Sequence, residues 1–296
     1  MATAMRRCCA IRSRPLRADA EAAVRAGTAP EHVVPLDPPA QTHGRIPTVK
    51  AQAVAASLSQ RAHELQQDGR HGEAIAIYED VVRRFGEDHD PQLRDQVALS
   101  LLNGGIALDH LGRKREALAA WEEMARRSGD PSDPWLRHCV FTSVYNRAAT
   151  LQALGRHQQA VEAYDEVLSR FGDLADPDDR ALLAAAMAEQ GSILAVLGRP
   201  SEALPVYDEV LRRFGDDEHP GTQSTVARTL LLKAAAVRRQ GRPWEADAAT
   251  AELLRRFGGS QDPAVAELVD YARRDEQRAL GGSSGTRRRP KRQRSR

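Results

Sequence analysis

The side chains that could carry chemistry do not form a catalytic or metal-binding pattern. His138 and Cys139 are adjacent, and neighbouring side chains on a helix point about 100° apart. Cys8 and Cys9 stand together near the start of the sequence. The sequence contains no HExxH, no CxxC, no phosphate-binding glycine loop and no serine in a GxSxG setting. We therefore expect no catalytic residue, no metal site and no cofactor.

Acidic pairs recur in the sequence, but their surroundings point to structure rather than to acid–base catalysis. Asp165-Glu166 and Asp208-Glu209 each follow a tyrosine, and arginines stand a few residues further along. Opposite charges three or four residues apart form local ion pairs on a helix surface. These pairs therefore indicate a solvated helix face.

The composition excludes several protein classes. The 296 residues are 41% hydrophobic and 28% charged, and no apolar run approaches the length of about 18 residues that spans a membrane. The first residues are basic but lack the apolar stretch of a secretory signal. Three cysteines without metal-site spacing cannot form a disulfide framework. These features predict a cytoplasmic protein.

Several sequence markers recur with a period of 43 residues, which is the signature of a repeat architecture. An aromatic series lapses only at Thr250, and a phenylalanine series is interrupted only at Ser128. The other markers are a Gly-Arg pair, an alanine and a proline: Gly69, Gly112, Gly155, Gly198 and Gly241; Ala74, Ala117, Ala160, Ala203 and Ala246; Pro91, Pro134, Pro177, Pro220 and Pro263.

Each copy reads as two helices. The first begins after an aspartate N-cap and a first-turn proline, as at Asp90-Pro91, whereas His219-Pro220 breaks this pattern. It runs for about 20 residues, or about 30 Å. A glycine such as Gly112 supplies the left-handed residue that ends it. The second helix places Ala117 and Trp121 on one face, and a further glycine stops it.

These helix pairs predict an all-α fold, since a pair of this length buries its apolar stripe only by stacking on its neighbours. We expect a right-handed α-solenoid of five helix-turn-helix repeats with a C-terminal capping helix. The repeats begin near residues 48, 91, 134, 177 and 220, and the cap spans 263–280. Residues 1–47 and 281–296 are expected to be a disordered N-terminal arm and a disordered basic tail.

The order small residue, turn glycine, alanine and aromatic resembles the tetratricopeptide repeat, over about residues 49–280. The small residues are Ala62, Gly105, Ala148, Gly191 and Ala234. The period departs from the usual 34 residues, as in long-repeat variants found in high-GC bacteria. The resemblance implies a non-enzymatic adaptor whose first helices line a concave groove that holds a partner peptide or helix.

A polar column on the first helices is the candidate groove surface, with ordinary solvation as the alternative. Asparagine amides can bond a peptide backbone, and Arg147 or Lys233 could receive a carboxylate. The family's clamp for chaperone C-terminal tails needs further polar residues where Ile106 and Ala149 stand, which argues against that ligand. The candidate residues are Arg61, Asn103, Asn146, Arg147, Glu189, Gln190 and Lys233.

The basic C-terminus supports a second hypothesis. Residues 48–286 carry a formal net charge of −8, whereas the last ten residues carry seven basic groups and no acid. This tail could bind phosphate backbones or an anionic membrane, fold back on the acidic body, or have no role of its own. Its basic residues are Arg287, Arg288, Arg289, Lys291, Arg292, Arg294 and Arg296. A third hypothesis makes the chain a regulatory partner of a separately encoded signalling or protease enzyme.

Overall fold

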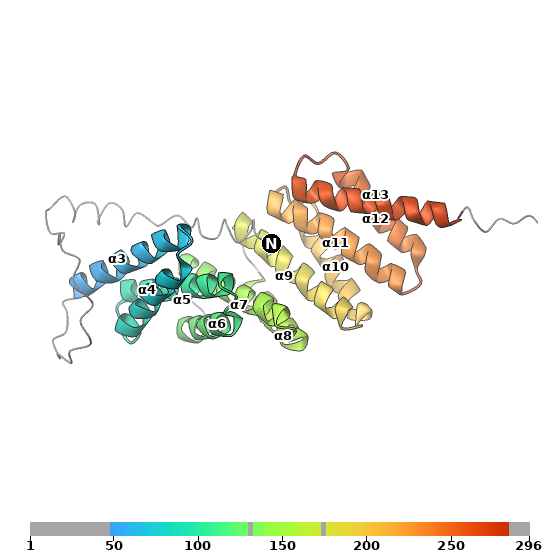
Figure 1. The fold of residues 1–296 in the computed structure, drawn as a ribbon. Coiled ribbons are helices and arrows are strands. Elements are labelled where there is room, and N and C mark those ends of the chain that lie inside the picture. Colours follow the sequence, from blue (N-terminus) through green and yellow to red (C-terminus); the bar gives the residue numbers. More distant parts are fainter. Residues whose placement is uncertain (1–47, 130–132, 173–175, 284–296) are drawn as a thin grey trace, which may run out of the picture. The chain divides into compact units, whose positions relative to one another are not determined.

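Helices alternate between two lengths along the chain (Figure 1). The structure is a computed structural model that describes residues 48–129, 133–172 and 176–283, and over these ranges it contains helices and no strand. First helices of 20 residues are α3 (Thr48–Gln67), α5 (Pro91–His110), α7 (Pro134–Ala153), α9 (Pro177–Val196) and α11 (Pro220–Arg239). Second helices of 15 residues are α4 (His71–Phe85), α6 (Lys114–Ser128), α8 (His157–Phe171), α10 (Pro200–Phe214) and α12 (Pro243–Phe257). The last helix is α13 (Pro263–Ser283).

These helices belong to two units, with the boundary between Thr150 and Leu151 near the end of α7. In the first unit, α3 packs on α4 and α5, and α5 also packs on α4 and α6. In the second unit, α9 and α11 pack on each other and on the second helices beside them, and α13 covers α11 and α12. This packing confirms the all-α, solenoid-type fold predicted from the repeat.

The ends of the helices are specified by local sequence. Asp90 accepts a hydrogen bond from the Leu93 backbone N–H at 3.1 Å, and Asp176 accepts one from Asp178 at 2.9 Å. His219 makes no side-chain cap, as its break in the pattern predicts. The turn glycines have φ between 73° and 77°, a conformation that L residues rarely adopt. They are Gly69, Gly112, Gly155, Gly198 and Gly241.

In the α5–α6 and α9–α10 pairs, the core joins the small residue of the first helix to the aromatic residue of the second. Trp121 and Tyr207 are at most 1% exposed. A Cβ on Gly105 would lie 2.5 Å from Trp121 Nε1, and one on Gly191 would lie 2.5 Å from Tyr207 Cε1. Burial raises the pKa of Tyr207 to about 12. Close approach of the paired helices therefore requires glycine at these two positions.

An arginine near the end of α6, of α10 and of α12 joins that helix to the repeat before it. Arg127 donates to the backbone carbonyl of Gly86, Arg213 to that of Gly172 at 2.5 Å, and Arg256 to that of Gly215. These carbonyls lie at the C-terminal ends of second helices, where backbone acceptors lack helical partners and cations are favoured. The contact explains why basic residues precede the phenylalanine marker, a link that the sequence did not predict.

Glu123 supports one of these arginines, and this makes a pH-dependent contribution to stability. Hydrogen bonds from Arg126 and then Arg127 lower the pKa of Glu123 to about 2, against partial burial that raises it. A lowered carboxylate pKa stabilises the fold above the unfolded value of about 4.3, and this contribution is lost as pH falls toward about 2.

Glu123→Gln should therefore lower the free energy of unfolding at pH 7 by about 1 kcal/mol, since solvent screens the partly exposed pair, and should have no effect near pH 2. Urea denaturation across this pH range measures the difference. Glu122→Gln is the matched control, because the neighbouring Glu122 is exposed and has no ion pair among the described residues. An equal loss at both pH values would contradict the assignment to Glu123.

Candidate partner-binding surface

Two asparagines occupy the same repeat position on successive first helices. Asn103 in α5 and Asn146 in α7 are 43 residues apart and are the only asparagines in the sequence. Their side chains are 8% and 6% exposed. Neither has a side-chain hydrogen bond among the described residues, although neither amide is sealed from solvent. Both amides are therefore open to a hydrogen-bonding ligand.

The equivalent residue in the second unit is already paired. Glu189, which is 9% exposed, accepts hydrogen bonds from Arg228 in α11 and, at 3.3 Å, from Gln152. A carboxylate held between an arginine and an amide has fewer lone pairs left for a ligand. The described part of the polar column thus differs between the units: amides are open in the first, and an ion pair occupies the second.

The residue that follows this position points to the preceding second helix. Gln190 donates to Asp165 in α8 at 2.5 Å, and Lys233 pairs with Asp208 in α10 at 2.5 Å. The first acid of each acidic pair therefore bonds to the next repeat rather than to its own helix. The second acids pair locally as predicted, Glu166 with Arg170 at 2.8 Å and Glu209 with Arg212 at 2.5 Å.

The two remaining column residues differ in exposure. Arg61 in α3 is exposed, and the structure gives it no ion pair within the described ranges. Arg147 in α7 is partly buried. Arg61 is therefore the most accessible cation of the candidate surface, while Gly104 leaves the corresponding position of α5 without a side chain.

Other predicted features yield no further site. The basic residues Arg287 to Arg296 lie outside the described residues, as do Cys8 and Cys9. Cys139 is buried and forms no disulfide with another described residue. Within the described ranges, no three histidine, cysteine or acidic side chains converge as metal ligands, and no helix is long and apolar enough to cross a bilayer.

Paired helices that stack through small residues, aromatic residues and turn glycines define a helix-turn-helix repeat protein. Residues 140–216 match the family model described as tetratricopeptide repeat. This match confirms the predicted resemblance to the tetratricopeptide repeat. Such a fold supports a protein–protein interaction scaffold. A comparison with curated proteins found no match.

Solved structures show the same fold at low sequence identity. BtubC (BKLC) from P. vanneervenii is 19% identical with a TM-score of 0.55, covering 84% of this chain and 88% of its own. Kinesin light chain-type TPR-like repeats from Podosopora anserina are 21% identical with a TM-score of 0.52, covering 77% and 98%. The MamA protein is 13% identical with a TM-score of 0.51, covering 70% and 92%.

Proposed function

We propose that this chain is a non-enzymatic adaptor that binds a partner polypeptide on the first helices of residues 48–150. The observation that carries the proposal is the pair of open amides at Asn103 and Asn146. A side-chain amide offers one acceptor and two donors, the groups that an extended backbone also presents. These hydrogen bonds would bind the partner's backbone and would therefore depend little on the partner's side chains.

First helices of successive repeats pack on each other where their contacts are described, α3 on α5 and α9 on α11, and we take α5 and α7 to be spaced alike. Neighbouring packed helices lie about 8–10 Å apart, and an extended chain advances about 3.3 Å per residue. Equivalent amides on successive first helices would therefore contact an extended peptide about every three residues. Both amides reach solvent, so a ligand that bonds to them replaces water, and each hydrogen bond adds about 0.5–1.5 kcal/mol to binding.

Charge on the same helices suggests which ligand groups lie nearby. Arg61 is exposed and makes no direct ion pair in the described part of the chain, although it attracts Glu73 electrostatically, and Arg147 is the other cation of the column in this unit. A partner segment that carries a carboxylate would meet Arg61 with little competition. In the second unit Glu189, Gln190 and Lys233 would have to exchange their present partners before binding a ligand.

The double variant Asn103→Ala and Asn146→Ala should lose the partner while keeping the fold. The measurement is a pull-down from nuclease-treated native lysate with residues 1–286, washed at moderate salt, so that the basic tail takes no part. The matched control is Gln158→Ala with Gln159→Ala, two exposed amides on the second helix α8. Proteins retained by the parent chain and the control, but at least tenfold depleted with the asparagine variant, would support the surface. Equal retention by all three would contradict it.

The other functional hypotheses rest on residues or enzymes that the structure does not include. Nucleic-acid binding by the tail, with the repeats recruiting partners, stays a prediction because Arg287 to Arg296 lie outside the described ranges. Regulation of a separately encoded signalling or protease enzyme would use the same scaffold with a different partner. The pull-down identifies such an enzyme if it is the retained protein.

A further inference from the structure

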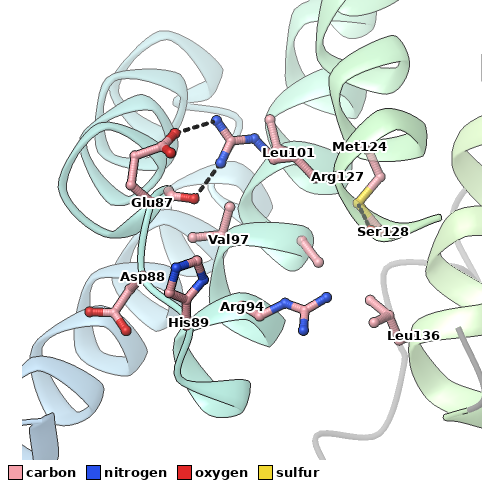
Figure 2. A pocket seen from close by; sticks show the side chains of 12 residues that line it. Glu87, Asp88, His89, Arg94, Val97, Leu101, Met124, Arg127, Ser128 and Leu136 are labelled. Atoms are coloured by element: carbon pink, nitrogen blue, oxygen red, sulfur yellow. Dashed lines mark hydrogen bonds and ion pairs between the residues drawn. The ribbon is translucent and has the colours of Figure 1, made fainter.

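A pocket of about 250 Å³ opens in the first unit between the loop after α4, helix α5, the end of α6 and the start of α7 (Figure 2). Val97, Leu101, Met124 and Leu136 form apolar walls. Arg127 lies on one side, where it reaches Glu87, and Arg94 lies on another, between His89 and Leu136. Ser128 stands at the wall formed by α6.

The pocket lies where a repeat marker is missing. Phenylalanine occupies the equivalent of Ser128 in the other copies, at Phe85, Phe171, Phe214 and Phe257, and each of these rings is at most 6% exposed. At Ser128 the ring is replaced by a hydroxyl that donates only to Met124 Sδ at 3.6 Å. The space that the sister repeats fill with a phenyl ring is therefore left open here.

The groups that receive that ring are still present. In α9 and α10, the guanidinium groups of Arg180 and Arg213 lie 5.4 and 5.3 Å from the centre of the Phe214 ring. The equivalent residues two repeats earlier in the sequence are Arg94 and Arg127. Both line the pocket. Guanidinium groups at this distance attract an aromatic face. The pocket thus keeps the shape and the cations of an aromatic site without its ring.

Arg94 also lacks the partner that holds its counterpart. Arg180 donates to Asp217 at 3.1 and 3.3 Å, whereas the sequence has Pro131, which carries no carboxylate, at the equivalent repeat position, outside the described residues. Arg94 is exposed and has no side-chain hydrogen bond or ion pair among the described residues. Its guanidinium is therefore available to a ligand.

We propose that this pocket receives an aromatic side chain of a partner polypeptide, with Arg94 against the ring. The ring does not come from residues 1–47 or 284–296, which contain no Phe, Trp or Tyr. The pocket lies apart from Asn103 and Asn146, which do not line it. The assignment of a polypeptide rests on the proposed adaptor function, but the pocket can be tested without any partner.

The test uses the full chain with ¹³C-labelled methionine methyl groups and N-acetylphenylalaninamide as the probe. Met124 lines the pocket, and Met187 in α9 is the internal reference. We expect a saturable upfield shift of the Met124 methyl signal at millimolar probe, with Met187 unchanged. Ser128→Phe, which restores the ring of the sister repeats, should abolish the shift, and Ser128→Ala should keep it.

A second variant separates an aromatic site from a simple apolar hole. Arg94→Ala should weaken the binding of N-acetylphenylalaninamide by roughly two- to fivefold and leave the binding of N-acetylleucinamide unchanged. No Met124 shift, or an equal shift in Ser128→Phe, would overturn the pocket proposal. A Met124 shift that depends on protein concentration and disappears in Trp244→Ala would instead assign the site to a second copy, since Trp244 is 63% exposed.

The outcome is independent of the asparagine surface. Probe binding with equal pull-down by the asparagine variant would retain the pocket and overturn the proposed surface. If the asparagine variant loses the partner and the parent chain does not bind the probe, the asparagine surface is retained and the pocket proposal is overturned. When a partner has been identified, replacing its single aromatic anchor by alanine should reduce binding to the parent chain and leave binding to Ser128→Phe unchanged.

Discussion

Gly105→Ala is expected to destabilise the fold by about 1–3 kcal/mol, although alanine is the better helix former. The added Cβ would lie 2.5 Å from Trp121 Nε1 and 2.8 Å from Trp121 Cε2. The indole is 1% exposed and packs against Ile75, Ala107 and Leu108, so moving it away from the added Cβ disturbs this cluster. The steric cost should therefore outweigh the gain of about 1 kcal/mol that Gly→Ala brings to an open helix position.

Urea denaturation followed by circular dichroism measures this effect, and Gly72→Ala is the matched control. Gly72 lies in the first turn of α4 with no atom within 4 Å of an added Cβ, so the same substitution there should be neutral or stabilising. Trp121→Tyr in the Gly105→Ala background should recover part of the loss, because it restores the alanine–tyrosine pair of Ala148 and Tyr164. Stabilisation by Gly105→Ala would show that the two helices can move apart freely.

Phe214→Ser should lower the free energy of unfolding by about 3–5 kcal/mol, the range for removing a buried aromatic ring. Phe214 is 1% exposed and lies against Arg180 and Arg213, so its loss leaves a cavity and removes two cation–π contacts. The variant reproduces in the second unit the serine that stands at position 128 in the first.

Urea denaturation of the variant, with tryptophan fluorescence as the probe, measures the loss. Ser128→Phe provides the reciprocal experiment and should raise the free energy of unfolding or leave it unchanged, because the pocket already has the space for a ring. A loss below about 1 kcal/mol for Phe214→Ser would mean that the site collapses around the smaller side chain.

The sequence shows where the repeat markers are interrupted, but only the structure shows how each interruption affects packing. Ser128 interrupts the phenylalanine series, and the pocket lies at that position. Gly104 stands where the other copies carry a long polar side chain, and it lines a second apolar cavity with Tyr78 and Leu108. At Ser128 and Gly104, the departure from the internal repeat thus coincides with an unfilled space in the packing.

The amino-acid sequence by itself determined the helices and their ends. Aspartate caps, first-turn prolines and left-handed glycines act on backbone groups within a few residues, so Asp90 and Gly112 have the roles that their spacing predicts. The period of 43 residues also specified which helix faces are buried, because equivalent positions in each copy pack against equivalent positions of the neighbouring copies.

Only the tertiary structure decided which polar residues of the first helices are open. Gln190 and Lys233 bond to acids 25 residues earlier, and Arg213 reaches a carbonyl 41 residues earlier. Asn103 and Asn146 have no such partner among the described residues. A hydrogen bond between repeats depends on how two helices are placed and on which side chain the facing position happens to carry. Local patterns show neither, so identical positions in the repeat become paired in one copy and open in another.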